Sequence, residues 1–289
     1  MHYVQAKGLL SKDNGINIYR GCSHGCIYCD SRSKCYGFTH KFEDIEVKEN
    51  APELLEQALK SKRKRCMIGT GAMCDPYLHA EETLGLTRKC LALIDKYEYG
   101  VSILTKSSRI LRDMDLLESI HKKAKAVVQM TLTTYDEELC KIIEPNVSTT
   151  KERFETLMQF KKVGIPTMVW LSPILPFIND TEDNIRGILE YCREAEVKGI
   201  IFFGMGVTLR EGDREYFYHA LDRHFPGMKQ KYISTYGNAY NLPSPNEKKL
   251  MQLVRNECKE AGIMCTVEEC FSYLNELPEK YVQQMLFDL

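Results

Sequence analysis

The stretch AVVQMTLTT, residues 126–134, carries the clearest signal for the fold. Five of its nine residues are apolar and five are β-branched, a composition that is typical of a buried strand in a parallel sheet. Five further runs of similar character lie on either side of it, at residues 16–21, 66–71, 100–107, 166–174 and 199–206. The chain therefore contains six candidate strands for a buried parallel sheet.

Longer segments with helical patterns alternate with these runs, near residues 51–61, 81–97, 109–123, 149–163, 181–196 and 211–224. The segment 181–196 is the clearest helix, because Asn179, Asp180 or Thr181 can cap its start, acidic residues fill its first turn and Gly199 marks its end. Strand and helix thus alternate about six times. We expect an α/β fold in which parallel strands with right-handed crossovers curl into a partial (β/α)6 TIM-like barrel.

The pattern changes after residue 225, where residues 224–245 are rich in Pro, Gly, Tyr and Asn. A helix at 246–261, a short strand at 263–267 and a terminal helix are predicted beyond it. We expect residues 1–225 to form the barrel. Residues 226–289 are interpreted as an α-rich C-terminal extension that caps the barrel, since a segment of this length buries little core alone.

The charge balance and the length of the apolar stretches indicate which classes of partner the protein has. Lys and Arg number 39 against 40 Asp and Glu, so no overall positive field indicates binding to nucleic acid or to a membrane. The beginning of the sequence lacks a signal-peptide pattern, and its apolar stretches are too short to span a bilayer. We therefore expect a cytoplasmic protein without membrane contacts, whose 12 cysteines are mostly reduced and buried.

Unusual polar clusters follow the predicted strands one after another. They are YRGCSHGCIYCD (19–30), GAMCDPY (71–77), TKSS (105–108), TLTTYD (131–136) and SPILPFIND (172–180). In barrels of parallel strands the chemistry gathers at the carboxyl ends of the strands. We therefore expect these clusters to meet at one rim and to form an active site there.

Three cysteines, Cys22, Cys26 and Cys29, crowd into eight positions of the first cluster. They cannot form a useful set of disulfides, but they suit a metal centre with one open position. A structural zinc site and a closed electron-transfer iron–sulfur cluster are alternatives, and either would need Cys35 as the nearby fourth ligand. A cluster held by three thiolates, with one iron left for an external ligand, would instead be a catalytic centre.

The CxxxCxxC spacing, with Tyr28 before the last cysteine, resembles the signature of the radical S-adenosylmethionine (SAM) superfamily. The order of the later clusters extends the resemblance over about residues 16–225 to the spore photoproduct lyase-like branch, also called DNA repair photolyase-like. The resemblance implies that Cys22, Cys26 and Cys29 hold a [4Fe–4S] cluster whose open iron binds SAM. Reductive cleavage of SAM would give a 5′-deoxyadenosyl radical that abstracts hydrogen from a substrate, with flavodoxin or ferredoxin as electron donor.

Several residues near the second and third strands are predicted to bind the cofactor together with Tyr28. Gly69, Thr70 and Gly71 are small enough for a ligand to approach the backbone, with a tight turn as the alternative. Asp75 is interpreted as an acceptor for cofactor or substrate, or as the cap of the following turn. Lys106 ends an apolar strand, where its charge is costly unless it meets an anion. The resemblance implies the carboxylate of SAM, and an ion pair at the rim is the alternative.

Ser107, Thr131 and Thr133 complete the predicted cofactor site. Ser107 is interpreted as a supporting donor or a helix cap. Thr131 and Thr133 alternate along one strand, so both hydroxyls lie on one face and are candidates for contacts to ribose or to the amino group. Ordinary strand propensity is the alternative explanation for both threonines.

Two differences separate this chain from true spore photoproduct lyases. The resemblance places Ala72 where those enzymes have a hydrogen-donating cysteine, and Asp30 where they have a tyrosine that relays the radical. Both differences argue against that repair reaction, and Cys74 is the candidate catalytic hydrogen donor in its place. Cys35, Cys265 and Cys270 are alternatives, because they lie in segments that could reach the same rim. The substrate stays open between a DNA lesion, a peptide, an RNA and a small metabolite, and a lyase reaction is one of several radical-initiated outcomes.

Overall fold

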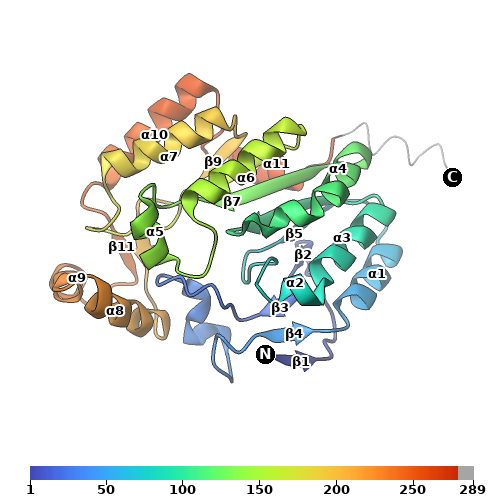
Figure 1. The fold of residues 1–289 in the computed structure, drawn as a ribbon, viewed down its shortest axis with the longest axis horizontal. Helices are drawn as coiled ribbons and strands as arrows, with labels where there is room; N and C mark the ends of the chain where they lie inside the picture. Colours follow the sequence, from blue (N-terminus) through green and yellow to red (C-terminus); the bar gives the residue numbers. More distant parts are fainter. Residues whose placement is uncertain (279–289) are drawn as a thin grey trace.

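A computed structural model of the protein describes residues 1–278. Six parallel strands form the main sheet in the order of the chain (Figure 1): β2 (Gly15–Ile16), β5 (Met67–Thr70), β6 (Gly100–Thr105), β7 (Ala126–Thr131), β8 (Thr167–Trp170) and β9 (Gly199–Ile201). Each strand pairs with the one before it, and no pairing between β9 and β2 occurs within residues 1–278. The sheet is thus the wall of an open, partial barrel.

Five helices cover the outer face of the sheet (Figure 1): α1 (Ala51–Ser61), α3 (Leu86–Lys96), α4 (Met114–Lys123), α6 (Thr150–Lys162) and α7 (Glu182–Glu194). Their apolar stripes pack on the outward side chains of the strands, such as Ile68 and Val128, which are fully buried. Of the three cap candidates for α7, Thr181 is the cap, since its hydroxyl accepts a hydrogen bond from the backbone N–H of Asn184. The helices predicted at 51–61, 149–163 and 181–196 are confirmed.

Two predicted strands are shorter than expected, because their second halves pair elsewhere. The run 16–21 continues as β3 (Tyr19–Arg20), which pairs with β4 (Glu46–Lys48), and β4 also pairs with β1 (His2–Val4). The run 199–206 ends at Ile201, and β10 (Gly206–Thr208) pairs with β11 (Asn241–Pro243). These partners lie outside the βα repeat, so the apolar pattern of the runs did not reveal the breaks.

Two predicted helices also begin differently. The helix predicted at 81–97 is divided by Gly85, whose φ of +60° ends the short α2 (Glu81–Leu84) before α3 starts. The helix predicted at 109–123 starts as a 3-10 turn over Ser108–Asp113 and becomes α-helical only in α4. A short helix that the sequence did not indicate, α5 (Glu137–Ile143), follows the fourth strand of the barrel.

The chain continues with α8 (Asp213–His224), α9 (Met228–Tyr236), α10 (Glu247–Ala261) and α11 (Val267–Asn275). Helix α10 packs on α7 and α11 packs on β9. The strand predicted at 263–267 is reduced to one bridge between Met264 and Gly199. The division at residue 225 falls between α8 and α9, which contact each other, and it stays a prediction.

The two faces of the sheet bury different clusters. Outward residues pack against the helices, whereas inward residues Met67, Val127 and Met168 pack against Cys270 and Leu274 of α11. Helix α11 therefore fills one end of the barrel interior. Because neighbouring residues of a strand point to opposite faces, the inner face continues through Gly71, Lys106 and Thr131 toward the carboxyl ends.

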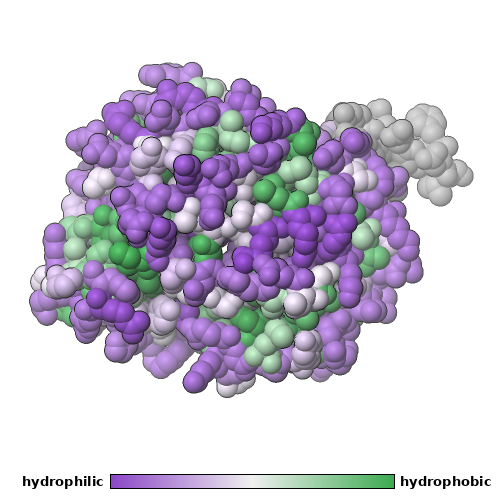
Figure 2. All heavy atoms as spheres, in the orientation of Figure 1, coloured by the Kyte–Doolittle hydropathy of each residue, from purple (hydrophilic) through white to green (hydrophobic). Residues whose placement is uncertain are grey.

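No helix within residues 1–278 is long and apolar enough to cross a membrane. Figure 2 shows a mainly hydrophilic surface on the face drawn, interrupted by hydrophobic residues around α5. Beneath this surface, Ile143 of α5 packs with Ile27. Ile27 belongs to the loop of residues 21–29 that contains the three clustered cysteines, which we call the cysteine loop. The apolar residues around α5 thus belong to the packing that supports this loop.

Candidate active site

A cavity lies at the carboxyl end of the inner face, where the cysteine loop meets the ends of β5 and β6. It is lined by the three clustered cysteines together with Tyr28, Gly71, Cys74, Asp75 and Lys106. These residues come from three segments that the sequence analysis placed at one rim. The structure thus brings together the cysteines and the residues following the second and third predicted strands.

The segment after α5 holds the cysteine loop in place. The backbone N–H of Ile27 donates to the Ile143 carbonyl at 3.0 Å, and the N–H of Asn146 donates to the His24 carbonyl at 3.1 Å. Gly25 has a φ of +74°, and a side chain there would meet the Asn146 amide nitrogen at 3.1 Å. Segment 143–146 therefore serves as the support of the cysteine loop.

The three sulfurs are too far apart to form a single-ion site. Within residues 1–278, the only three His, Cys, Asp or Glu ligand atoms that all lie within 4.8 Å of one another belong to His2, His40 and Asp44. Tetrahedral zinc with bonds of about 2.3 Å would hold its thiolates about 3.8 Å apart. The spread of Cys22, Cys26 and Cys29 around one cavity fits a larger centre such as an iron–sulfur cluster.

Cys35 lies apart from the three cysteines. It is exposed, it does not line the cavity, and its sulfur accepts a hydrogen bond from Arg210 at 3.3 Å. A zinc site or a closed cluster would need it as the fourth ligand, so this arrangement disfavours both alternatives. The donor set instead fits a cluster with three protein thiolates.

Charged and polar neighbours favour a thiolate at Cys22. Side-chain contacts with Cys74 and His24 lower the pKa of the Cys22 thiol well below its ordinary value, against the effect of burial. Burial disfavours the charged form of His24, but Asp75 and Cys22 outweigh it and raise the pKa of that imidazole. Burial raises the pKa of both Cys26 and Cys29. A bound metal centre would favour the thiolate form of both residues.

Lys106 lines the cavity, and its ammonium group has no hydrogen-bond or ion-pair partner among residues 1–278. Burial disfavours its charge, but Cys26 and Glu144 nearby outweigh burial and raise the pKa of Lys106 above its ordinary value. A charged amine in this position is suited to an anionic ligand.

Asp75 has a structural role in this arrangement. Its carboxylate accepts hydrogen bonds from the Thr105 hydroxyl at 2.7 Å, the Lys106 backbone N–H at 2.8 Å and the Tyr77 N–H at 2.9 Å. The oxygen that binds Lys106 also lies 3.6 Å from His24 Nδ1. Asp75 thus joins the end of β6 to the cysteine loop, in agreement with its interpretation as a cap.

A buried ion pair lies behind the cysteine loop. Glu144 and Arg153 are almost completely buried, with 2.6 Å between carboxylate and guanidinium, and the Tyr28 hydroxyl donates to the same carboxylate. Burial opposes ionisation of Glu144, yet the charges of Arg153 and Lys106 outweigh it and hold the pKa of Glu144 below its usual value. Arg153 also donates to the Thr131 carbonyl at 2.9 Å. The Tyr28 hydroxyl therefore binds the buried Glu144 carboxylate and helps to hold the cysteine loop in place.

The remaining predicted residues do not line the cavity. Gly69 and Thr70 lie within β5, where they pair with both neighbouring strands. The Ser107 hydroxyl accepts from the Arg109 N–H at 3.3 Å, as expected for its alternative interpretation as a helix cap. Thr131 and Thr133 are buried on the inner face. Their contacts with a cofactor stay predictions.

A polar network that was not predicted from the sequence lies on the inner face of the sheet. Gln129 donates to the Ser102 hydroxyl at 2.6 Å and accepts from the Trp170 indole N–H at 2.6 Å. These residues tie β6, β7 and β8 together inside the barrel. A glutamine between Val128 and Met130, in an otherwise apolar strand, was the signal that could have revealed it.

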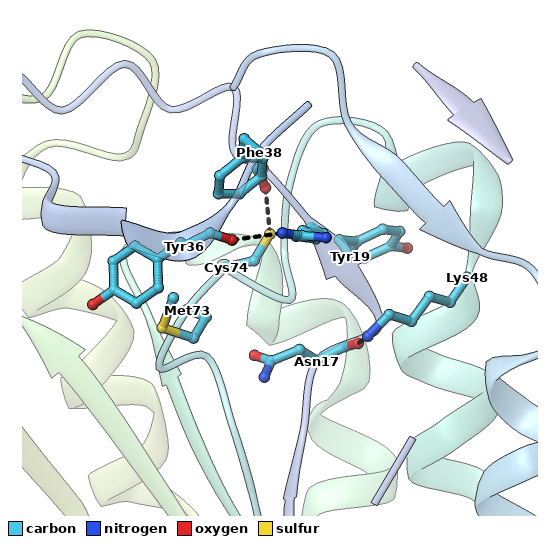
Figure 3. Close-up of a pocket in the computed structure, with 9 residues that line it drawn as sticks. Asn17, Tyr19, Tyr36, Phe38, Lys48, Met73 and Cys74 are labelled. Atoms are coloured by element: carbon cyan, nitrogen blue, oxygen red, sulfur yellow. Dashed lines mark hydrogen bonds between the residues drawn. The ribbon is translucent and has the colours of Figure 1, made fainter. Parts of the chain in front are cut away.

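Three residues bear on the difference between this chain and spore photoproduct lyases, namely Cys74, Ala72 and Asp30. The Cys74 thiol donates to the Gly21 carbonyl at 2.7 Å, and Figure 3 shows it in an adjoining cavity lined by Tyr36, Phe38 and Lys48. Ala72 lines the cysteine cavity, and Asp30 accepts a hydrogen bond from Tyr36 at 2.8 Å. Cys74 is thus shared by the two cavities, while Asp30 anchors the 3-10 turns after the cysteines.

Gly71 is expected to tolerate no side chain. Its φ is +100°, and a Cβ atom would lie 1.8 Å from the Leu104 carbonyl oxygen. Gly71→Ala should lower the free energy of unfolding by at least ~2 kcal/mol, because backbone strain adds to the overlap. Gly37→Ala is the control, since Gly37 has a φ of +64° with open space around it. Denaturant unfolding that shows equal losses for both variants would contradict the expectation.

Comparisons with known proteins agree with the geometry. A sequence profile of the radical SAM superfamily matches residues 16–192. An uncharacterised protein of Mycobacterium tuberculosis is 27% identical over 250 residues, which are 83% of this chain and 72% of that protein. An uncharacterised protein of Methanocaldococcus jannaschii is 36% identical over 169 residues, covering 58% of this chain and 62% of that protein. This chain belongs to the radical SAM superfamily.

Spore photoproduct lyase complexed with dinucleoside spore photoproduct has a similar structure. The TM-score is 0.65 at 16% sequence identity, and the match covers 91% of this chain and 80% of the lyase. At this identity the likeness shows the fold alone, and it confirms the partial TIM-like barrel. Membership of the superfamily confirms the two predicted cofactors, a [4Fe–4S] cluster and SAM.

Proposed function

We propose that this radical SAM enzyme holds its [4Fe–4S] cluster on Cys22, Cys26 and Cys29 and binds SAM between that loop and Lys106. The observation that carries the proposal is one cavity lined by three thiols and a lysine whose ammonium has no partner within residues 1–278. When bound and reduced, the cluster with SAM supplies a 5′-deoxyadenosyl radical that abstracts hydrogen from a substrate.

The chain's own residues bind and shield the cofactors. The Lys106 ammonium would meet the carboxylate of SAM, and Gly71, which lines the same cavity, would leave room for a ligand beside β6. Segment 143–146 and the Glu144–Arg153 pair fix the loop from behind. A rigid, largely buried site of this kind excludes water from a reactive intermediate.

Removing the Lys106 charge is expected to weaken SAM binding. Lys106→Met should raise the Kd for SAM by ~30-fold or more, because truncating one member of a desolvated charge pair costs about 2–5 kcal/mol. Equilibrium binding to the anaerobically reconstituted protein measures this. Lys122→Met, at an exposed site on α4, is the matched control and should leave Kd unchanged. Unchanged affinity in Lys106→Met would contradict the assignment.

The substrate is proposed to enter at the carboxyl ends of β8 and β9. A cavity there is lined by Ser172 and Phe203, and Phe203 is 62% exposed beside Trp170. The DNA lesion, peptide, RNA and small-metabolite alternatives stay open. The structural engagement of Asp30 supports a reaction other than spore photoproduct repair, and Cys74 stays the proposed hydrogen donor.

An electron donor such as flavodoxin or ferredoxin is proposed to dock beside α8. A cavity there joins Gly25 and Ile27 of the cysteine loop to Lys141 and the exposed Arg223, against one acidic lining residue, Glu138. It therefore combines a net positive charge with a short path to the cluster. Arg223→Glu should slow reduction by an acidic donor protein about tenfold at low salt. Reduction by dithionite is the internal control and should not change. Equal slowing with both reductants would contradict this docking site.

A further inference from the structure

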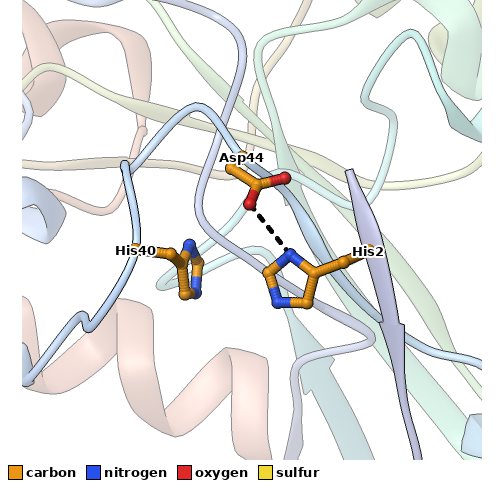
Figure 4. Close-up of side chains that lie close together, drawn as sticks. All are labelled: His2, His40 and Asp44. Carbon is orange, nitrogen blue, oxygen red and sulfur yellow. Dashed lines mark hydrogen bonds and ion pairs between the residues drawn. The ribbon is translucent and has the colours of Figure 1, made fainter.

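A second group of metal-binding side chains lies outside the cavity of the cysteines. Ligand atoms of His2, His40 and Asp44 lie within 4.8 Å of one another (Figure 4). His2 belongs to β1, whereas the other two residues come from the loop that precedes β4. Two imidazoles and one carboxylate are a ligand set that divalent transition metals such as zinc prefer.

The hydrogen bonding of His40 leaves its Nε2 atom available to bind a metal ion. Its Nδ1 lies 2.9 Å from the Lys41 carbonyl, which fixes the N–H on that nitrogen and leaves the lone pair on Nε2. Nε2 is buried and has no hydrogen-bond partner within the described residues, and the nearest carboxylate oxygen, from Glu46, is 3.8 Å away. A buried lone pair without a donor is costly unless a ligand meets it.

The other two residues complete the group. His2 Nδ1 lies 3.1 Å from one Asp44 oxygen, and the Met1 ammonium contacts the other oxygen at 2.5 Å. The rings of His2 and His40 meet edge to face with centroids 4.7 Å apart. A metal ion bound here would replace the proton shared by His2 and Asp44. Side-chain rotations that move the ligand atoms by about 1 Å would bring them to the spacing that a tetrahedral ion requires.

We propose that His2, His40 and Asp44 form a binding site for a divalent transition-metal ion of the zinc class, separate from the iron–sulfur cluster. The ion would tie strand β1 to the loop 37–45. That loop supports the catalytic region, because the Phe42 carbonyl accepts the backbone N–H of Cys22 at 3.1 Å. The ion would therefore stabilise a segment that supports the cysteine loop at Cys22, separately from the support that segment 143–146 gives at Ile27.

The test is zinc titration calorimetry on full-length protein without a histidine tag, in a Cys22→Ser/Cys26→Ser/Cys29→Ser background. This background removes the cysteine loop as a competing site. We expect one zinc ion per chain, and His2→Ala or His40→Ala should each weaken binding at least ~10-fold. His219→Ala, at an exposed position on α8, is the control and should bind like the parent. Zinc should raise the thermal midpoint of the parent but not of His40→Ala.

Cobalt substitution separates this site from the remaining cysteines. Cobalt bound to imidazole and carboxylate gives visible bands without the intense near-ultraviolet charge-transfer bands of thiolate ligation. His40→Gln serves as a second variant if circular dichroism shows that His40→Ala is unfolded. Zinc affinity that survives both substitutions at His40, thiolate bands from the bound cobalt, or no zinc binding by the folded parent would overturn the proposal.

Discussion

Cys26→Ser is expected to remove most of the iron from the reconstituted protein and to abolish cleavage of SAM. The parent should contain about four iron atoms per chain. Since the cluster supplies the electron, its loss should lower formation of 5′-deoxyadenosine by on the order of 10³-fold or more. Iron content and product formation under anaerobic conditions with dithionite measure the two effects.

Cys35→Ser is the matched control for Cys26→Ser. Both residues belong to the same N-terminal segment, but Cys35 is exposed and bonded to Arg210 rather than facing the cavity. This variant should keep full iron content and full activity. Loss of the cluster on replacing Cys35, or full iron content in Cys26→Ser, would contradict the three-cysteine site and favour a closed cluster.

Arg153→Met is expected to produce the largest loss of stability. The substitution leaves the buried Glu144 carboxylate without its ion pair at 2.6 Å, and breaking such a pair costs about 3–5 kcal/mol. Denaturant unfolding of the cluster-free protein measures this free energy. Lys229→Met removes an exposed pair with Asp222 and should change stability by less than ~1 kcal/mol. Equal losses in the two variants would contradict the role of the buried pair.

The same pair predicts how stability depends on pH. The pKa of Glu144 is held below its ordinary value, so its ionised form stabilises the fold above about pH 4.3. This contribution is lost as the pH falls through the lowered pKa of the folded state. Glu144→Gln should therefore lose less stability than the parent on acidification. A parallel loss in both proteins, measured by unfolding at several pH values, would contradict the assignment.

The sequence predicted the barrel because its signals are local. Apolar runs such as 126–134 mark buried strands whatever their partners, and Thr181 marks the start of α7 through a bond to its own first turn. The grouping of Cys22, Cys26 and Cys29 with Lys106 also followed from the order of the strands. Parallel strands place their carboxyl ends at the same rim.

What the sequence did not predict depends on contacts between distant segments. The pairing of β3 with β4, the engagement of Tyr28 by Glu144 and the bond between Asp75 and Lys106 each join residues with no shared local pattern. The inner-face network of Gln129 likewise required knowing which face of β7 is inward. Ser107 is the instructive case, since either interpretation was open until its hydroxyl was found to accept from Arg109.

We propose above that this chain cleaves SAM at a cluster held by Cys22, Cys26 and Cys29. The most direct measurement is 5′-deoxyadenosine formation by the iron-reconstituted parent under anaerobic conditions with SAM and dithionite. We predict product from the parent and none above background from Cys26→Ser. A parent that carries about four irons yet forms no product, or one that binds zinc in place of iron at the cysteine loop, would contradict the account.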